Sequence, residues 1–561
     1  MIFEIKSLLT SEVISISTVT HQGHVAMESP SKFDSITCKE LIRGGSPKVY
    51  QLKPKSKNIG TLKRMTLGEK DANTKNKTIL LLGETGTGKS TLINALVNYA
   101  IGVRWEDDVW FEIVEEKQTV SQSESQTSDV IVYEIFGFEG RVLPYSLTII
   151  DTPGYGDTRR VKRDAIIRQR LYDWFRSEDG IHELSAVGLV LKGSENRLSD
   201  RLLYIFDSVV SLFGKDVKNN FIALITHSDG ITPKNVLNAL EDAKIKCAKD
   251  EKKQIIHFLF NNYQKEDRSE NFEMLKNADN TSLKGLIGFT RFLAGIEPQK
   301  LKITTAVLNE RIRLEACIKN LKERITFLEM KQSEIHKTRE ALANYEQEMK
   351  KNENFTVEVE KVYKEKKSVD SGLWGLLFYE GATCCTVCEE NCHQPGCTIA
   401  WYPKHCEVMK RGHCTSCTRM CPVSVHVKEN WIYVNKTEKV KMTLQDMKEK
   451  YEANKAESES KLSLLEILEK KVKVLEMDKD KMLNESLQHV EALEKIALNV
   501  PSLSTVVCLD FLISKLGESK TEMKKKLEVI KSKMDDWTQA ALSYKKLVDV
   551  ENAIEAADFN Y

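Results

Sequence analysis

Short apolar runs separated by amphipathic stretches dominate the chain between residues 77 and 296. The runs are rich in branched side chains, as expected for strands that are buried on both faces. They read TILLLG, VIVYEIF, LTIIDTP, AVGLVLK, FIALIT and IIHFLF. Stretches with helical spacing lie between most of them, at 89–100, 160–176, 198–213 and 233–244. This alternation predicts an α/β fold with a mostly parallel sheet that is covered by helices.

Beyond Pro298 the pattern changes to apolar residues spaced seven positions apart, which predicts a first coiled-coil helix over 301–352. Its main seam is Leu314, Leu321, Leu328, Ile335, Leu342 and Met349, with Ile318 and Ile325 in the companion seam. A second helix is predicted over 443–499, with similar spacing at Leu468, Leu475, Met482 and Ile496 and an interruption at His489. The two helices favour a hairpin within the chain, while pairing with another copy remains the alternative. A further helical region is predicted over 503–561.

The first 60 residues have weak periodicity and many Ser, Thr and Lys residues, so we expect a flexible N-terminal segment there. The total of 561 residues is enough for three or four structural units. Lys and Arg total 83 against 82 for Asp and Glu, which leaves a net charge of +1. This balance argues against a purely electrostatic partner, and no nucleic acid is expected.

The chain has no run of 18 apolar residues, so no transmembrane segment is expected. Its first residues carry Glu4, Lys6 and Glu12, which makes a secretory signal a poor interpretation. We therefore expect a cytoplasmic protein, in which cysteines stay reduced or bind metal.

The segment GETGTGKS follows the first apolar run and precedes a helix, and it matches the phosphate-binding pattern G-x-x-x-x-G-K-[ST]. Glycines let the loop wrap so that backbone amides converge on a phosphate at a helix start. Lys89 would neutralise phosphate oxygens, and Ser90 would bind Mg²⁺ through its hydroxyl. The predicted cofactor-binding residues of the loop are Gly83, Thr85, Gly86, Gly88, Lys89, Ser90 and Thr91.

A second element, Asp151-Thr152-Pro153-Gly154, ends the run LTIIDTP. Asp151 would hold Mg²⁺ through water, and the Gly154 N–H would contact the γ-phosphate. Together with Lys89, these two residues are the predicted catalytic set. The switch threonine that coordinates Mg²⁺ is either Thr119 or Thr127, and we favour Thr127 because it lies just ahead of the run VIVYEIF.

A third element, Thr226-His227-Ser228-Asp229, follows the run FIALIT. A carboxylate at Asp229 can accept both N1–H and N2–H of guanine, which adenine cannot offer, so the sequence favours GTP over ATP. His227 stands where a common GTPase form has lysine, and it can still stack near the base.

These motifs, with the Ser-Leu-Phe-Gly run at 211–214 and Phe260-Asn261-Asn262, resemble the immune-associated GTPases of the IAN or GIMAP type. That family is related to septins and to chloroplast import receptor GTPases. The resemblance covers about 77–296 and implies a GTP-binding domain that forms a homodimer through its nucleotide face. It also implies that Asn261 or Asn262 lies near the base.

One departure concerns Tyr155, which stands where small signalling GTPases have the glutamine that positions water. We therefore expect slow hydrolysis by the monomer. Faster turnover would need a group donated across a dimer, and the candidates are Arg159, Arg160 and His227.

Nine of the 13 cysteines lie between Cys384 and Cys421, in a spacing that occurs twice. The repeats are Cys385-x2-Cys388-x3-Cys392-x4-Cys397 and Cys414-x2-Cys417-x3-Cys421-x4-His426. Such sets suit tetrahedral Zn²⁺. The simplest interpretation is one structural zinc per repeat, although ligands interleaved between repeats fit the sequence equally well. Disulfides are the competing interpretation.

Alternating residues on both sides of the cysteines predict a two-stranded ribbon within an insert over 353–442. We expect this ribbon to carry a zinc-stabilised tip that could contact an unknown protein or lipid surface. The alternative is that its aromatic residues fill a small core.

The combined prediction is a GTP-binding switch or assembly protein with slow hydrolysis that depends on dimerisation, using GTP, Mg²⁺ and Zn²⁺. The alternative function is a scaffold that binds GTP without hydrolysing it.

Overall fold

The computed structural model describes residues 32–543, apart from 34, 60–61, 116–129, 154–169, 196–197, 244, 370–380, 395–401, 452–463, 517–519, 535–537 and 540–541. Residues Met1–Lys39 form one unit and Glu40–Tyr561 another. Nearly all of the described elements belong to the second unit. None of the described helices is long and apolar enough to span a membrane.

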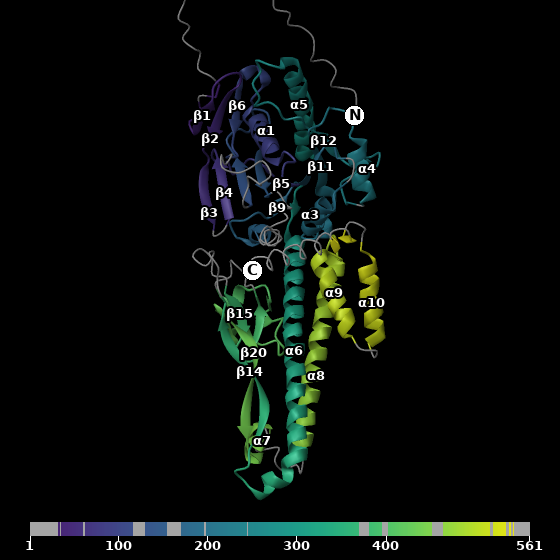
Figure 1. Cartoon of the computed structure of the whole chain (residues 1–561). Helices are drawn as coiled ribbons and strands as arrows, with labels where there is room; N and C mark the ends of the chain where they lie inside the picture. Colours follow the sequence, from purple (N-terminus) through teal and green to yellow (C-terminus); the bar gives the residue numbers. More distant parts are fainter. Residues whose placement is uncertain are drawn as a thin grey trace, which may run out of the picture. The chain divides into compact units, whose positions relative to one another are not determined.

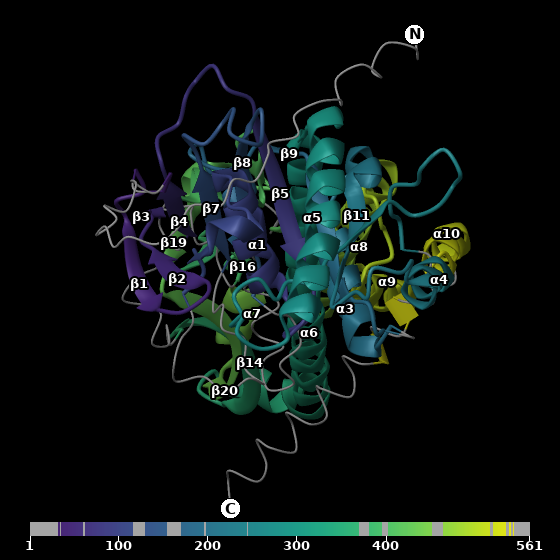
Figure 2. The ribbon, with the colours of Figure 1, turned by 90° about the horizontal axis from the view of Figure 1, so that it is seen from above.

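An eight-stranded sheet forms the core of the first half of the chain, in the order β12-β11-β10-β5-β8-β7-β4-β3. Neighbouring strands from β12 to β8 are parallel, and β7 runs antiparallel to β8. Figure 2 labels β3, β4, β7, β8, β5 and β11 from left to right, in agreement with this order. The bounds are β3 Lys55–Ile59, β4 Leu62–Leu67, β5 Asn76–Leu82, β7 Ile131–Ile135, β8 Ser146–Asp151, β10 Ala186–Lys192, β11 Phe221–Thr226 and β12 His257–Leu259. All six apolar runs contain strands, which confirms the predicted mostly parallel sheet.

Helices connect these strands, as the amphipathic stretches predict. They are α1 Lys89–Ile101, α3 Asp200–Val210, α4 Lys234–Asp242 and α5 Phe272–Gly295. Residues 170–176 are also helical. The start of α3 is fixed by the Ser199 hydroxyl, which accepts a hydrogen bond from the Leu202 N–H at 3.0 Å.

The structure differs from the expected flexible segment over 1–60, because strands occupy much of 39–67. They are β1 Lys39–Arg43 and β2 Lys48–Leu52, followed by β3 and β4, and β2 pairs in parallel with β6 Val109–Glu112. Strand β3 is the last of the large sheet, and it carries Lys55 and Lys57. Lysines on an edge strand discourage pairing with another chain. The lysines of β3 therefore belong to a solvent-exposed edge strand. In the sequence alone, such a lysine-rich stretch resembles a linker.

The second half of the chain is built on two long helices, α6 Lys302–Lys351 and α8 Leu464–Ile496, which pack along each other (Figure 1). The buried seam of α6 contains Leu314, Ile318, Leu321 and Ile325, and it belongs to the same apolar cluster as Met482, Leu487, Val490 and Leu493 of α8. The helices thus pair within one chain. The same cluster includes residues of α9 Leu503–Lys515 and α10 Thr521–Ser532.

The insert between these helices returns along α6 as a two-stranded ribbon, in agreement with the predicted alternation. Strand β14 Val357–Ser368 pairs antiparallel with β20 Trp431–Met442 over its whole length. The backbone N–H of Val362 donates to the Glu334 carboxylate of α6 at 2.8 Å, which holds the ribbon against the helix. The short helix α7 Leu444–Tyr451 follows the ribbon.

The cysteine-rich module at the end of the ribbon is not a free tip, which corrects the sequence prediction. Its strands are β15 Ala382–Cys385, β16 Glu390–His393, β17 Met409–Lys410, β18 His413–Cys414 and β19 His426–Glu429. Cys317 and Asn320 of α6 donate to the carbonyls of Thr415 and Ser416 at 2.9 and 2.7 Å. The sequence shows the length of the ribbon but not its direction, so the return toward the first half of α6 is a tertiary feature.

His489, which interrupts the apolar spacing of α8, faces a buried carboxylate on α6. The two groups, His489 Nδ1 and Glu310 Oε2, lie 2.7 Å apart. Arg313 and Lys410 also contact the Glu310 carboxylate, at 2.7 and 3.3 Å. Burial by itself raises the pKa of Glu310, but the His489 hydrogen bond and the nearby positive charges outweigh it and lower the pKa to about 2. Glu310 therefore joins both long helices and the cysteine-rich module.

We predict that Glu310→Gln lowers the free energy of unfolding at pH 7 by up to roughly 3 kcal/mol, the value of the pKa difference from 4.5 to about 2. A lowered pKa stabilises the fold fully above pH 4.5, and this contribution declines as the pH falls toward 2. Urea unfolding followed by circular dichroism at pH 7 and at pH 3 measures the effect. Glu315→Gln, at an exposed position of the same helix, is the control and should change little. An equal loss at both pH values would contradict the prediction.

Candidate nucleotide-binding site and cysteine cluster

The glycine-rich loop leaves the carboxyl end of β5, whose neighbours in the sheet are β10 and β8. Strand β8 lies on one side of β5 and β10 on the other, so the chain changes the direction in which it adds strands at β5. Ligands of open α/β sheets bind at such a switch point. A Cβ atom on Gly83 would lie 2.5 Å from the Val190 carbonyl oxygen, so no side chain fits there. Gly86 and Gly88 have φ angles of 80° and 81°, which favour glycine. The loop therefore has the curvature that the motif predicts.

Lys89 begins α1 and is 7% exposed. Its ammonium donates to the carbonyl oxygens of Gly83 and Glu84, both at 2.8 Å, and so lies within the curve of the loop. The remaining predicted loop residues, Thr85, Ser90 and Thr91, are partly buried beside it. A positive charge and a helix start at one place form a site for a phosphate group.

Asp151 ends β8 and is fully buried. The sheet register pairs it with Leu81, two positions before Gly83. The hydroxyl of the next residue, Thr152, donates to the Leu81 carbonyl at 2.9 Å and fastens the turn beside the glycine-rich loop. The predicted Gly154, Thr127 and its alternative Thr119 lie outside the described residues, as do Tyr155, Arg159 and Arg160.

The carboxyl end of β11 also meets the loop, because the Thr226 hydroxyl donates to the Thr87 carbonyl at 2.6 Å. His227 has a φ of 50° and lies against Gly88. Burial, followed by the charge of Lys192, lowers the pKa of His227, so its ring is neutral at pH 7. One oxygen of Asp229 accepts the Ile231 N–H at 2.9 Å.

The predicted base-side residues lie together at the ends of β11 and β12. The Ser228 N–H donates to the Phe260 carbonyl at 3.0 Å, which joins the two segments. Ser282 of α5 accepts the Asn261 N–H at 2.8 Å and donates to the Asn262 side chain at 2.7 Å. The structure thus brings His227, Asp229, Asn261 and Asn262 to the carboxyl ends of the parallel strands, where the loop also lies.

Two features of this site are absent from the sequence prediction. Lys192 ends β10, and its ammonium lies 4.0 Å from the place that a Cβ on Gly86 would occupy. Glu84 accepts a hydrogen bond from Ser199 at 2.8 Å, which ties the loop to the start of α3. The signal for Lys192 was its position at the carboxyl end of a predicted parallel strand.

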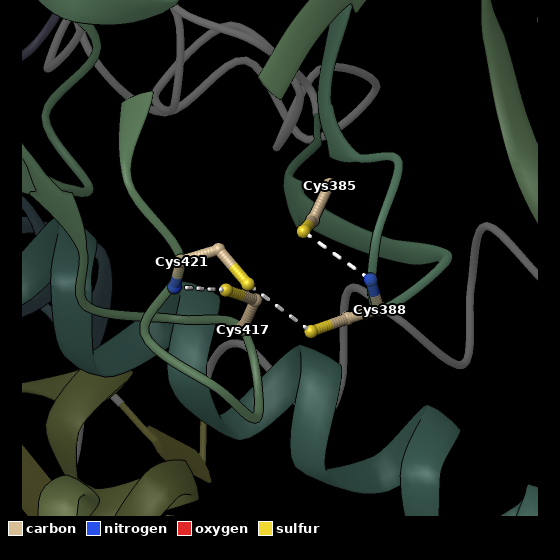
Figure 3. Close-up of side chains that lie close together, drawn as sticks. All are labelled: Cys385, Cys388, Cys417 and Cys421. Atoms are coloured by element: carbon tan, nitrogen blue, oxygen red, sulfur yellow. Dashed lines mark hydrogen bonds between the residues drawn. The ribbon is translucent and has the colours of Figure 1, made fainter. Parts of the chain in front are cut away.

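A compact cysteine cluster lies in the module between β15 and β19 (Figure 3). The described ligand atoms form two groups, each with members within 4.8 Å of one another. One group is Cys385, Cys388, Cys417 and Cys421, and the other is Cys392, Cys414, Cys417 and His426. Ligands from the two sequence repeats are therefore interleaved. The predicted ligand Cys397 lies outside the described residues.

The cysteines that the structure describes form no disulfides. The sulfur atoms of Cys388 and Cys421 lie 3.7 Å apart, far beyond the roughly 2.05 Å of a disulfide bond. A further group of potential ligands, His393, Cys406 and Glu407, lies in the same module. The arrangement favours metal binding over covalent cross-linking.

Comparison with known proteins matches the part of the chain that carries the first site. The AIG1 family matches residues 77–280. Septin-1 of Drosophila melanogaster is 27% identical over 183 residues, which cover 30% of this chain and 44% of the septin. Septin-5 of Homo sapiens is 25% identical over 174 residues, which cover 28% and 42%. The chain spans less than half the length of these curated relatives.

Solved structures with a similar fold include Toc33 from Arabidopsis thaliana in complex with Mg²⁺ and GMPPNP. It is 17% identical with a TM-score of 0.28, and the match covers 40% of this chain and 88% of Toc33. Translation elongation factor SelB from Methanococcus maripaludis, in complex with the GTP analogue GppNHp, is 14% identical with a TM-score of 0.22, covering 40% and 36%. The family match and the motifs carry the assignment: residues 77–280 form a GTPase domain of the AIG1 family, the IAN or GIMAP type.

Proposed function

We propose that the protein binds GTP with Mg²⁺ and acts as a nucleotide-controlled switch with slow hydrolysis. The observation that carries this proposal is the meeting of Lys89, Asp151 and the Asp229 segment at the carboxyl ends of the parallel strands, around a loop whose backbone requires or favours glycine at 83, 86 and 88. The family of residues 77–280 supports it.

In this proposal the loop amides and Lys89 hold the β- and γ-phosphates, and Lys192 adds a second positive charge. The Ser90 hydroxyl and the buried Asp151 carboxylate are oxygen ligands of the kind that Mg²⁺ prefers. They would hold the ion directly and through water. The ion would neutralise charge that develops on the phosphates during transfer.

The base would lie between the His227–Asp229 segment and Asn261 or Asn262. A carboxylate at Asp229 accepts two N–H groups of guanine, whereas adenine presents acceptor and C–H positions there. Such charge-assisted hydrogen bonds contribute roughly 1.5–3 kcal/mol, which is enough for strong selection.

We predict that the full chain binds GTP more tightly than ATP in calorimetry with Mg²⁺. Lys89→Ala should weaken GTP binding roughly 10- to 100-fold, because a charge-assisted contact is lost. Asp229→Ala should reduce the preference for GTP over ATP. Lys234→Ala, an exposed lysine on α4, is the control and should bind GTP normally. Equal affinity of the unmodified protein for both nucleotides would overturn the guanine assignment.

A switch needs a route from the nucleotide to the rest of the chain, and residues 170–176 offer one. They come after the Asp151 turn in the sequence and contact both α6 and the cysteine-rich module. The Tyr172 hydroxyl donates to Asn309 of α6 at 2.8 Å. Arg176 donates to the Glu407 carboxylate and to the His405 carbonyl in the cysteine-rich module. These contacts provide the connection that a switch requires.

We further propose that hydrolysis requires pairing of two copies through the nucleotide face. Tyr155 replaces the glutamine that positions water in small signalling GTPases, so a second copy would have to supply a group such as Arg159, Arg160 or His227. The catalytic set within one chain would then be Lys89, Asp151 and Gly154.

We predict that the single-turnover rate of phosphate release per molecule rises with protein concentration over the range where dimers form. Light scattering of the same samples, with GDP and with a non-hydrolysable GTP analogue, measures dimer formation. A constant rate across that range would contradict dimer-dependent hydrolysis. Absence of phosphate release, with an unchanged mass in both nucleotides, would favour the scaffold instead.

A further inference from the structure

We propose that the cysteine-rich module binds two zinc ions that share one ligand, the thiolate of Cys417. Cys385, Cys388 and Cys421 would complete the first ion, and Cys392, Cys414 and His426 the second. Each ion takes ligands from both sequence repeats. This proposal is independent of the nucleotide site.

The number of ligands is the first argument. Two tetrahedral zinc ions need eight coordination positions. The two described groups contain seven different residues, and Cys417 is the member common to both. Seven residues therefore fill eight positions when the Cys417 sulfur bridges the two ions. No ligand from Cys397 is needed.

The spacing of the sulfur atoms is the second argument. Two thiolates on one tetrahedral zinc lie about 3.8 Å apart, given a zinc–sulfur distance of about 2.3 Å. The sulfurs of Cys388 and Cys421, one from each repeat, are separated by 3.7 Å. Figure 3 shows the sulfur atoms of Cys385, Cys388 and Cys421 turned toward the space between them, with Cys417 beside Cys421. The interleaved pair thus already has the separation that shared coordination requires.

The orientation of His426 is the third argument. Its side chain is almost fully buried, with 5% exposure. Its Nδ1 lies 2.9 Å from the Pro422 carbonyl oxygen, which fixes the ring and makes Nδ1 the protonated nitrogen. Its Nε2 is buried, forms no regular hydrogen bond among the described residues, and lies next to the thiols of Cys414 and Cys385 as a member of the second ligand group. Zinc-binding histidines have this arrangement, with one nitrogen on the metal and the other on a carbonyl.

Backbone amides around the cluster favour thiolates over neutral thiols. The N–H of Cys388 donates to the Cys385 sulfur at 3.4 Å, and the N–H of Cys417 donates to the Cys414 sulfur at 3.4 Å. The Cys421 N–H donates to the Cys417 sulfur itself, at 3.2 Å. Six thiolates with two divalent cations leave a net negative charge. The Lys364 ammonium, 3.3 Å from the Cys388 carbonyl oxygen, lies where it offsets that charge.

A small core of neutral thiols would be the simpler explanation of buried cysteines, and Cys384 is an example of one. Its sulfur lies 3.5 Å from Asn391 Oδ1 and 3.7 Å from the Trp431 carbonyl, so it faces the ribbon. The cluster sulfurs instead accept amide hydrogens and face one another. Adjacent cysteines in the sequence therefore have different roles.

The test measures zinc content and X-ray absorption of the full chain, purified under reducing conditions with zinc. We expect two zinc ions per chain in the module and a zinc–zinc separation of about 3.7 Å, the value for two tetrahedral ions that share one sulfur. Absence of a zinc–zinc contribution, or a single zinc, would overturn the proposal. This measurement uses the unmodified protein and does not depend on the folding of a variant.

Two variants separate a shared ligand from an eighth one. Cys397→Ser should retain both ions and the zinc–zinc contribution, because the seven described ligands suffice. Loss of one zinc in this variant would show that Cys397 is a ligand and would overturn the sharing of Cys417. Cys384→Ser is the matched control, since it removes a neighbouring buried thiol outside the cluster, and it should also retain both ions.

Discussion

The burial of the Arg311 guanidinium is the constraint on which the arrangement of the large unit depends. A buried cation is costly unless its donors are paired, and a guanidinium has five of them. Arg311 of α6 is 6% exposed and donates to the carbonyls of Ser211 and Asn499 and to the hydroxyls of Ser502 and Thr505. These acceptors follow α3 or lie at the start of α9. The GTPase domain and the helices that follow it therefore meet at the Arg311 guanidinium. Separating them would leave this buried charge without its hydrogen-bond acceptors, at a large cost in free energy.

Other contacts connect the same parts of the molecule. Arg311 holds the first turns of α6 against the GTPase domain. Residues 170–176 contact α6 through Tyr172 and Asn309, and they contact the cysteine-rich module through Arg176 and Glu407. Glu310 joins the same module to His489 of α8. A change at the nucleotide edge would thus act on a packed assembly, whose interfaces have few alternative arrangements. Two bound zinc ions would stabilise the folded module, so that it could respond as a rigid body to such a change.

Local pattern predicted much of this molecule, because each successful prediction depends on neighbours in sequence. The six apolar runs contain strands since burial on both faces demands branched side chains, and Gly83 to Lys89 form the expected loop between β5 and α1. The interruption at His489 was visible but had no explanation, because its partner Glu310 lies on the other helix. The strands after Lys39 were missed because this stretch carries many lysines and looks like a linker, although only β1 and β3 among them are edge strands.

The sequence by itself determined the residues available for chemistry in this protein: the phosphate-loop pattern, the aspartate that we propose selects guanine, the heptads and a repeated set of candidate metal ligands. Those features are encoded within a few residues by φ preferences, side-chain type and spacing. Only the tertiary structure decided that the ribbon returns along α6, that the repeats interleave around Cys417 and that Lys192 joins the phosphate loop. These outcomes depend on which distant groups become neighbours, and that choice is made by packing and by the pairing of buried polar groups, which no local pattern records.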